Sequence, residues 1–211
     1  MVASAANSAP AAPAKPASSK WVNLFDGKTL RGWKKTNFGG EGDVLVKDGA
    51  IFMDYGADLT GATMEKWPLR RINYEVELEG QRVEGQDFFV GVTFPVKDTY
   101  CSLILGGWGG GVCGISSIDS YDASENETTS YENFKIGQWY KVKLQVVEGR
   151  IKAWLDGKEL VDLETEGKKL SVRFEVEPCQ PFGLCAFQTQ AAIRNLRARE
   201  IPAPVNASKE K

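Results

Sequence analysis

Apolar and polar side chains alternate most clearly between Gln138 and Leu163. The run from Trp139 to Val147 has the period of two that is typical of a β-strand with one buried face. Glu148-Gly149 then predicts a tight turn, because glycine adopts the positive φ that hairpin turns require. A second alternating run follows, and after Asp156-Gly157 the chain returns as a third strand. The segment QWYKVKLQVVEGRIKAWLDGKELVDL therefore predicts an antiparallel meander with one face in the core.

Short runs of the same kind recur along the rest of the chain, and none has the period of a helix. The run from Asp87 to Phe94 is almost continuously apolar, which predicts an interior strand. About a dozen short strands without a helix are typical of an all-β protein, here a jelly-roll sandwich of two antiparallel sheets. Further strands are expected at Val44–Met53, Arg71–Glu79, Tyr100–Leu105, Leu170–Val176, Phe182–Thr189 and Ala191–Glu200.

Composition divides the chain into a folded domain and two tails. Residues 1–20 are almost wholly Ala, Pro, Ser, Asn and Lys, and residues 202–211 are similar, so both are predicted to be disordered. The domain is expected to span residues 21–201. Such a leader is typical of the segment after a signal peptide, which predicts a secreted or periplasmic protein. No apolar run approaches the ~18 residues of a membrane span.

Charge and residue usage exclude several functions. The formal net charge is −2, so no basic face for nucleic acid is expected. The chain has no histidine, which excludes a Ser-His-Asp hydrolase and a His-ligated zinc site. A metal would have to be a hard cation such as calcium, held by oxygen ligands. The four cysteines (Cys101, Cys113, Cys179, Cys185) fit either two local disulfides or four free, buried thiols.

A long irregular segment from Gly106 to Glu132 is the first candidate site, since long loops inside compact domains are often functional. Its glycines allow a ligand to approach the backbone, and Trp108 can stack on a sugar ring. Tyr121 and Tyr131 offer further aromatic surface. Its candidate acids and bases are Asp119, Asp122 and Glu125, which with loop carbonyls could alternatively hold calcium. The competing interpretation is a solvated, mobile acidic loop.

Two weaker candidates lie on predicted strands. Glu75, Glu77 and Glu79 alternate along one strand and so share one face, which we interpret as a solvated outer face rather than a catalytic one. Asp87 stands at the start of the apolar strand, and its place at the edge of a binding groove is implied by the family resemblance that follows.

Four segments in order resemble the 3-keto-disaccharide hydrolase domain family: WVNLFDGKTLRGW, YEVELEG, GQWYKVKLQVVEGRIKAWLDGKELVD and FGLCAFQTQAAIRNLRARE. The resemblance extends from Trp21 to Ile201. It implies a concanavalin-like jelly roll, export in bacteria and action on sugars, in some members on 3-keto-glucosides. The middle differs, because TYCSLILGGWGGG stands where many members have a polar strand.

The leading hypothesis is therefore an exported domain that cleaves the glycosidic bond of a keto-sugar glycoside. A 3-keto group acidifies the proton on C2, so elimination needs one carboxylate base and a polar group or metal on the carbonyl oxygen. Asp122 or Glu125 is the predicted base and Trp108 the sugar platform. The alternatives are a non-catalytic carbohydrate-binding module and a structural domain of a larger exported assembly.

Overall fold

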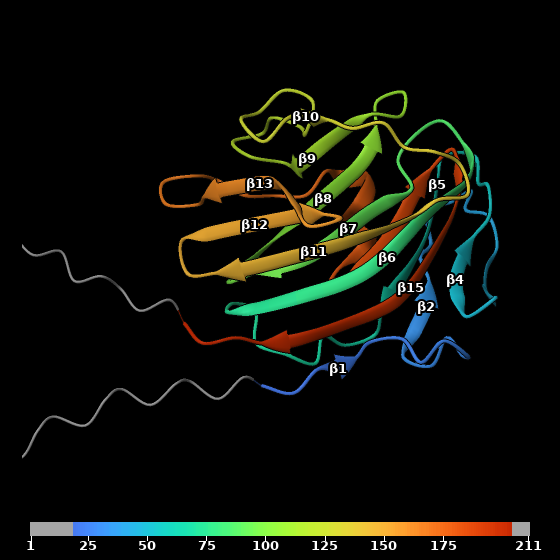
Figure 1. Ribbon diagram of the computed structural model, residues 1–211, viewed down its shortest axis with the longest axis horizontal. Helices are drawn as coiled ribbons and strands as arrows, with labels where there is room; N and C mark the ends of the chain where they lie inside the picture. The colour runs from blue at the N-terminus through green and yellow to red at the C-terminus, as the bar shows by residue number, and fades with distance from the viewer. Residues whose placement is uncertain (1–18, 204–211) are drawn as a thin grey trace, which may run out of the picture.

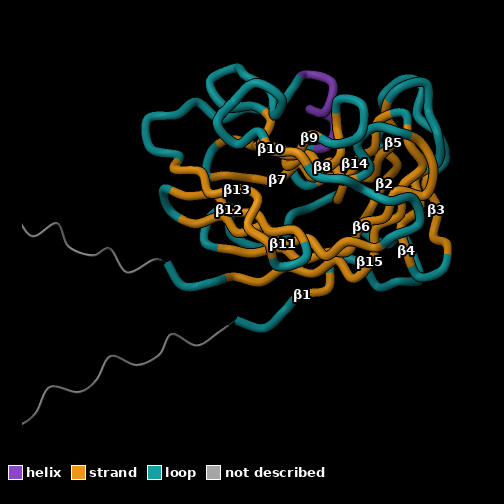
Figure 2. The backbone as a smooth tube through the Cα atoms, turned by 45° about the horizontal axis from the view of Figure 1, so that its top comes forward, coloured by secondary structure: helices purple, strands orange, loops and turns teal. Residues whose placement is uncertain are grey.

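The computed structural model describes residues 19–203. The predictions of disorder at the two ends lie almost wholly outside these residues. Within them the strands extend from Val22 to Glu200 and form two antiparallel sheets, which Figures 1 and 2 show as two layers. The predicted two-sheet sandwich is therefore confirmed.

The first sheet has eight strands in the order β13-β12-β11-β6-β15-β4-β3, with β1 paired to β15. Its longest strands, β6 and β15, lie side by side at its centre (Figure 1). The bounds are β1 Val22–Asn23, β3 Val44–Lys47, β4 Ala50–Met53, β6 Tyr74–Gly85, β11 Trp139–Val147, β12 Arg150–Leu155, β13 Lys158–Glu164 and β15 Thr189–Glu200.

The second sheet has seven strands in the order β10-β9-β8-β7-β14-β5-β2. The apolar run after Asp87 becomes β7, which is buried along its whole length between β8 and β14, as an interior strand should be. The bounds are β2 Trp33–Lys35, β5 Leu59–Met64, β7 Val90–Val96, β8 Thr99–Gly107, β9 Val112–Ser116, β10 Ser130–Tyr131 and β14 Gly183–Phe187.

The predicted meander is present as β11, β12 and β13. Val142 pairs with Leu155 and Val146 with Ile151, and these apolar side chains are buried in the core. Gly149, in the first turn, has a φ of 73°, the positive value for which a turn glycine was expected. The period of two therefore identified both the strands and the face that they bury.

The core lies between the two sheets and collects the inward side chains of both. Tyr74 of β6 is fully buried there, and its hydroxyl donates to the Pro95 carbonyl of β7 at 2.6 Å. Burial of one such large side chain contributes on the order of 2 kcal/mol. This hydrogen bond joins the two layers and satisfies a polar group that would otherwise be unpaired.

The predicted strand at Leu170–Val176 is wrong. Phe174–Cys179 instead form a 3-10 helix, η1, drawn purple in Figure 2, which packs against β5 and β14 of the second sheet. Pro178 lies within it and has no N–H to give to a strand ladder. The alternation in SVRFEVE does not mark one buried face, because Val176 packs on the sheet while Phe174 is 77% exposed. The expectation of no helix is corrected with it.

All four cysteines are free and buried. Of the two alternatives that the sequence left open, the buried thiols are the ones found. In the part of the chain that the structure describes, no helix has the length and apolar character needed to cross a membrane.

Candidate functional site

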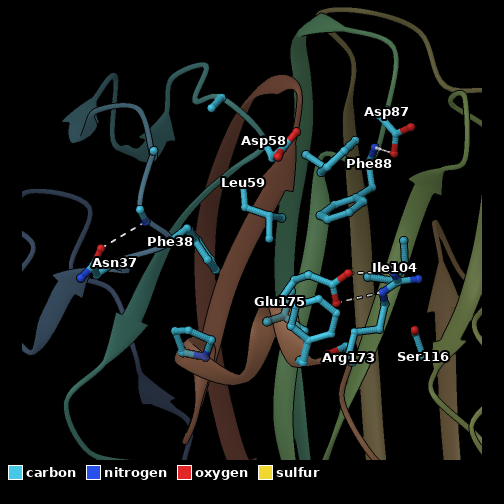
Figure 3. Close-up of a pocket in the computed structure, with 18 of the residues that line it drawn as sticks. Asn37, Phe38, Asp58, Leu59, Asp87, Phe88, Ile104, Ser116, Arg173 and Glu175 are labelled. Atoms are coloured by element: carbon cyan, nitrogen blue, oxygen red, sulfur yellow. Dashed lines mark hydrogen bonds and ion pairs between the residues drawn. The ribbon is translucent and has the colours of Figure 1, made fainter.

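A pocket of about 660 Å³ opens on the outer face of the second sheet (Figure 3). Its floor is formed by side chains of β5, β8, β9 and β14 that point away from the core. Its walls are the loop before β3, the turn before β7, the glycine loop (residues 106–111, from the end of β8 to the start of β9), and η1. The main lining residues are Asn37, Phe38, Asp58, Leu59, Asp87, Phe88, Ser102, Ile104, Trp108, Ser116, Arg173, Phe174, Glu175, Val176 and Phe187.

The floor carries no charged side chain. The lining residues of β8 and β9 are Ser102, Ile104 and Ser116, which the alternation of the strands directs outward. Gly91 of β7 keeps the floor flat, because a Cβ there would lie 2.7 Å from the Cys185 sulfur. The ionised groups of the pocket therefore all come from its walls.

Arg173 and Glu175 are the charged pair of the η1 wall (Figure 3). Arg173 Nη2 lies 2.8 Å from Glu175 Oε1, and Nε lies 3.2 Å from Oε2, so the pair is bidentate. The hydrogen bonds from Arg173 lower the pKa of Glu175 although partial burial opposes them. The same bonds raise the pKa of Arg173. Glu175 is therefore ionised at neutral pH.

Asp122 forms an ion pair with Arg173 of the pocket wall. Its other oxygen accepts hydrogen bonds from Ser117 Oγ at 3.1 Å and Ser116 Oγ at 3.3 Å. Asp122 is not among the lining residues. The predicted base is thus placed where it orients the guanidinium rather than where it meets a ligand.

Asp87 and Trp108 both line the pocket, as the sequence suggested for a binding groove. Asp87 Oδ1 accepts from the Phe88 amide at 2.8 Å, and Oδ2 accepts from the Gly109 amide at 3.0 Å. Trp108 is 44% exposed, so one part of its ring system is open to a ligand. Their roles in binding stay predictions.

The remaining predicted site residues lie elsewhere. Tyr121 and Tyr131 are 58% and 72% exposed and do not line the pocket. Asp119 accepts a hydrogen bond from the Lys169 amide at 2.8 Å, and Glu125 is exposed. The structure therefore does not gather the acidic loop into one site.

Hydrogen bonds of Asn126 and Thr128 hold one part of that loop. The side-chain nitrogen Nδ2 of Asn126 donates to three backbone carbonyls, that of Ile115 at 2.8 Å, that of Tyr121 at 3.1 Å and that of Asp122 at 2.7 Å. Thr128 is buried and donates back to Asn126 at 2.6 Å. Between residues 19 and 203, no group of three or more His, Cys, Asp or Glu side chains is arranged to hold a metal. A calcium site formed by Asp119, Asp122, Glu125 and loop carbonyls stays a prediction.

Sequence reasoning missed the η1 wall and the aromatic Phe38. Arg173, Phe174 and Glu175 were assigned to a strand, and Asp58 lies in a short connection with no distinctive pattern. The one available signal was Pro178, which follows SVRFEVE directly and argues against a strand in the interior of a sheet.

The glutamate triplet lies on the outer face of the first sheet, as interpreted from its alternation, but the expected solvation does not hold for Glu75, whose side chain is 2% exposed. Each carboxylate pairs with an arginine of β15: Glu75 with Arg199 at 2.6 Å, Glu77 with Arg197 at 2.6 Å and Glu79 with Arg194 at 2.8 Å. A second hollow of about 820 Å³ lies over this face. Its lining includes Glu77 and Glu79, the carboxylates paired with Arg197 and Arg194.

Comparison with solved structures shows the fold. A carbohydrate-binding module, CBM66 from Bacillus subtilis, is 11% identical with a TM-score of 0.55, over 80% of this chain and 96% of that one. The Crh5 transglycosylase in complex with NAG is 12% identical with a TM-score of 0.56, over 89% and 86%. A Bacillus subtilis protein with a galectin-like fold is 9% identical with a TM-score of 0.58, over 81% and 90%.

No curated protein matches the chain significantly. The model of a protein family described as the 3-keto-alpha-glucoside-1,2-lyase-like domain matches residues 20–199. This range is nearly the one over which the sequence resembled the family, and it includes the strands of both sheets up to the last residue but one of β15. The chain belongs to the family of 3-keto-alpha-glucoside-1,2-lyase-like domains.

Proposed function

We propose that the pocket binds a glycoside whose glucose unit carries a 3-keto group, and that the domain breaks the glycosidic bond by 1,2-elimination. Family membership over residues 20–199 supports the substrate class. The observation that carries the reaction is the Arg173–Glu175 pair in the pocket wall. One group is a carboxylate and the other a cation that can bind a carbonyl oxygen.

The lining favours elimination over direct hydrolysis. Hydrolysis of an ordinary glycoside requires two carboxyl groups whose pKa values are separated, one acid and one base. The pocket contains Asp58, Asp87 and Glu175, and both oxygens of Asp87 are held by backbone amides. Glu175 has a lowered pKa, which does not suit a general acid. A 3-keto sugar needs only one base, because its carbonyl acidifies the C2 proton.

In the proposed step, Glu175 removes the proton from C2. The electron pair of the C2–H bond forms the C1=C2 double bond, the bond from C1 to the glycosidic oxygen breaks, and that oxygen leaves with its electron pair and is protonated by water. Arg173 binds the C3 carbonyl oxygen, where negative charge develops. When the guanidinium turns to that oxygen, its hold on Glu175 weakens and the carboxylate becomes more basic.

Two aromatic side chains are placed to hold the sugar. Trp108 and Phe174 both line the pocket and are 44% and 77% exposed. An aromatic ring offers an apolar face to the C–H face of a sugar, while wall groups such as Asn37 can bond its hydroxyls. Two further aromatic rings of the lining, Phe88 and Phe187, stack on each other with their centres 6.0 Å apart.

The test is turnover of p-nitrophenyl 3-keto-α-glucoside by the full chain, with hydrogen or deuterium at C2. Elimination predicts a primary isotope effect and an unsaturated keto-sugar product with ultraviolet absorbance. Glu175→Gln should abolish turnover and retain binding. The matched control is Glu177→Gln, since Glu177 is exposed on the same 3-10 helix and does not line the pocket. Release of nitrophenol without an isotope effect would contradict the elimination.

A second candidate function is a non-catalytic carbohydrate-binding module. The observation that favours it is the floor, where β8 and β9 present Ser102, Ile104 and Ser116 and no carboxylate. This candidate predicts binding of the keto-glucoside by calorimetry, with no product and no exchange of the C2 proton in D2O.

Export of the protein is a separate proposal that rests on the composition of the leader, and cell fractionation of the native organism would test it.

A further inference from the structure

Arg82 of β6 is a buried cation without a carboxylate partner. Its side chain is 5% exposed, and it forms no ion pair with any described residue. Burial lowers the pKa of the guanidinium, whereas the charge of Asp87 opposes that shift. Arginine is almost never buried in this way unless it is paired, so its position calls for a physical reason.

The guanidinium is directed at the glycine loop after β8. Arg82 Nη2 donates to the Gly106 carbonyl at 3.0 Å and to the Gly110 carbonyl at 2.9 Å. Its carbon Cζ lies 5.1 Å from the ring centre of Phe89 and 5.7 Å from that of Phe134. One cation thus holds both ends of the loop that carries Trp108.

A second anchor of opposite charge holds the same loop from the pocket side. The Gly109 amide, directly after Trp108, donates to Asp87 Oδ2 at 3.0 Å. The other oxygen of Asp87 accepts from the Phe88 amide, which fixes the carboxylate itself. The loop therefore has three backbone groups fixed from two different elements of the fold.

The loop is shaped for a single conformation. Trp108 has a φ of 48°, a left-handed value that is unusual for a residue with a side chain. A Cβ on Gly106 would lie 2.4 Å from Arg82 Nη2, and one on Gly110 would lie 2.7 Å from the Gln86 carbonyl oxygen. Such strain persists only where the surrounding structure holds it, and here Arg82 and Asp87 do so.

We propose that Arg82 is a positioning residue for Trp108: it fixes the glycine loop so that the indole presents a preorganised platform to the ligand. The identity of the ligand in this inference rests on the proposed function. The conformation assigned to the loop does not depend on it. Preorganisation raises affinity because the loop does not have to be ordered on binding.

The binding test uses p-nitrophenyl 3-keto-α-glucoside and calorimetry. Arg82→Met keeps much of the apolar stem against Phe89 and Phe134 but removes both hydrogen bonds. We expect it to weaken binding about tenfold, the loss typical of bonds from a charged donor. In a Trp108→Ala background the same change should have no further effect. Equal, additive losses in both backgrounds would show that Arg82 does not act through Trp108.

The matched control is Arg71→Met. The Arg71 guanidinium lies 4.5 Å from the Tyr100 ring centre and donates to the Thr99 carbonyl at 2.9 Å, so it is also stacked and bonded to backbone. The Arg71 guanidinium contacts the start of β8, whereas the glycine loop is at the other end of that strand. Affinity for the sugar should be unchanged in this variant.

A measurement without ligand separates this inference from the proposed function. Hydrogen exchange at the Gly109 amide should accelerate about tenfold or more in Arg82→Met and remain at the wild-type rate in Arg71→Met. If the sugar does not bind but exchange accelerates as expected, the proposed ligand is wrong and the positioning role stands. Unchanged exchange would overturn the role. If neither Arg82→Met nor Arg82→Lys folds, Arg82 serves the fold as a whole and the role is rejected.

Discussion

Arg173, directly before η1, and Glu175, in its first turn, face each other as a bidentate ion pair within the wall of the pocket. Asp122 holds the guanidinium from a different loop. The pair is therefore oriented before a ligand arrives, and its charges offset each other in the empty site. In the proposed function, the carbonyl oxygen of the ligand competes with Glu175 for the guanidinium of Arg173. Binding of the ligand therefore raises the basicity of Glu175.

The first prediction concerns the pH dependence of kcat/KM. Turnover needs ionised Glu175, and the pKa of this carboxyl in the free protein is below its usual value of 4.5. The acid limb of the profile should therefore lie below pH 4.5. Arg173→Met removes the group that lowers the pKa, so any residual activity should show its acid limb at higher pH. An unshifted limb would mean that another group is the base.

The second prediction concerns the two aromatic platforms. Trp108→Ala and Phe174→Ala should each weaken binding of p-nitrophenyl 3-keto-α-glucoside by about tenfold, the order expected for loss of one aromatic contact. Tyr131→Ala is the control, because Tyr131 is more exposed, at 72%, but does not line the pocket. Titration calorimetry measures all three. A loss confined to Tyr131→Ala would place the site on the acidic loop instead.

The third prediction concerns stability at the glutamate triplet. The side chain of Glu75 is 2% exposed between Arg199 and Lys143, whereas that of Glu77 is 32% exposed. Glu75→Ala leaves two cations without their partner and should lower the free energy of unfolding by about 3 kcal/mol. Glu77→Ala should cost about 0–1 kcal/mol. Urea denaturation of both variants checks the contrast.

The same glutamate predicts an acid sensitivity. Burial pushes the pKa of Glu75 upward, but hydrogen bonds from Lys143 and Arg199 outweigh it, so the pKa lies below the ordinary 4.5. A carboxyl with a lowered pKa stabilises the fold fully above its unfolded value and loses that contribution as the pH falls through its folded value. The stability difference between the wild type and Glu75→Ala should therefore shrink below pH 4.5. A difference that stays constant down to pH 2 would contradict this ion-pair account.

The fourth prediction concerns the thiols. Burial raises the pKa of Cys101 to about 12 and that of Cys113 to about 11, so neither is a thiolate at neutral pH. The native protein at pH 8 should react with a thiol reagent far more slowly than the unfolded protein, which should expose all four cysteines. Fewer than four reactive thiols after unfolding without reductant would show a disulfide.

The fifth prediction concerns metal removal. In the proposed reaction Arg173 binds the carbonyl oxygen, a role that a metal would otherwise fill. Turnover should therefore be the same before and after dialysis against EDTA. Loss of activity that calcium or another divalent cation restores would reject Arg173 in this role.

Local patterns predicted the sheets well and the site poorly. The meander could be predicted because each of its strands pairs with its neighbour in sequence and buries alternate residues. The pairing of Val142 with Leu155 is an example. The pocket instead joins Phe38, Asp87 and Glu175, which come from distant parts of the chain. Proximity in sequence favoured the acidic loop, whereas in the tertiary fold three of its carboxylates, Asp122, Glu127 and Glu132, form ion pairs with basic side chains.

The 3-10 helix η1 gives the outer face of the second sheet a boundary. Val176 and Cys179 are packed against Leu59 and Cys185, and the Pro178 carbonyl accepts a hydrogen bond from Thr63 at 3.0 Å. The pocket is therefore bounded by η1 on one side. For the proposed function, this boundary predicts that a short glycoside binds better than the internal units of a polysaccharide.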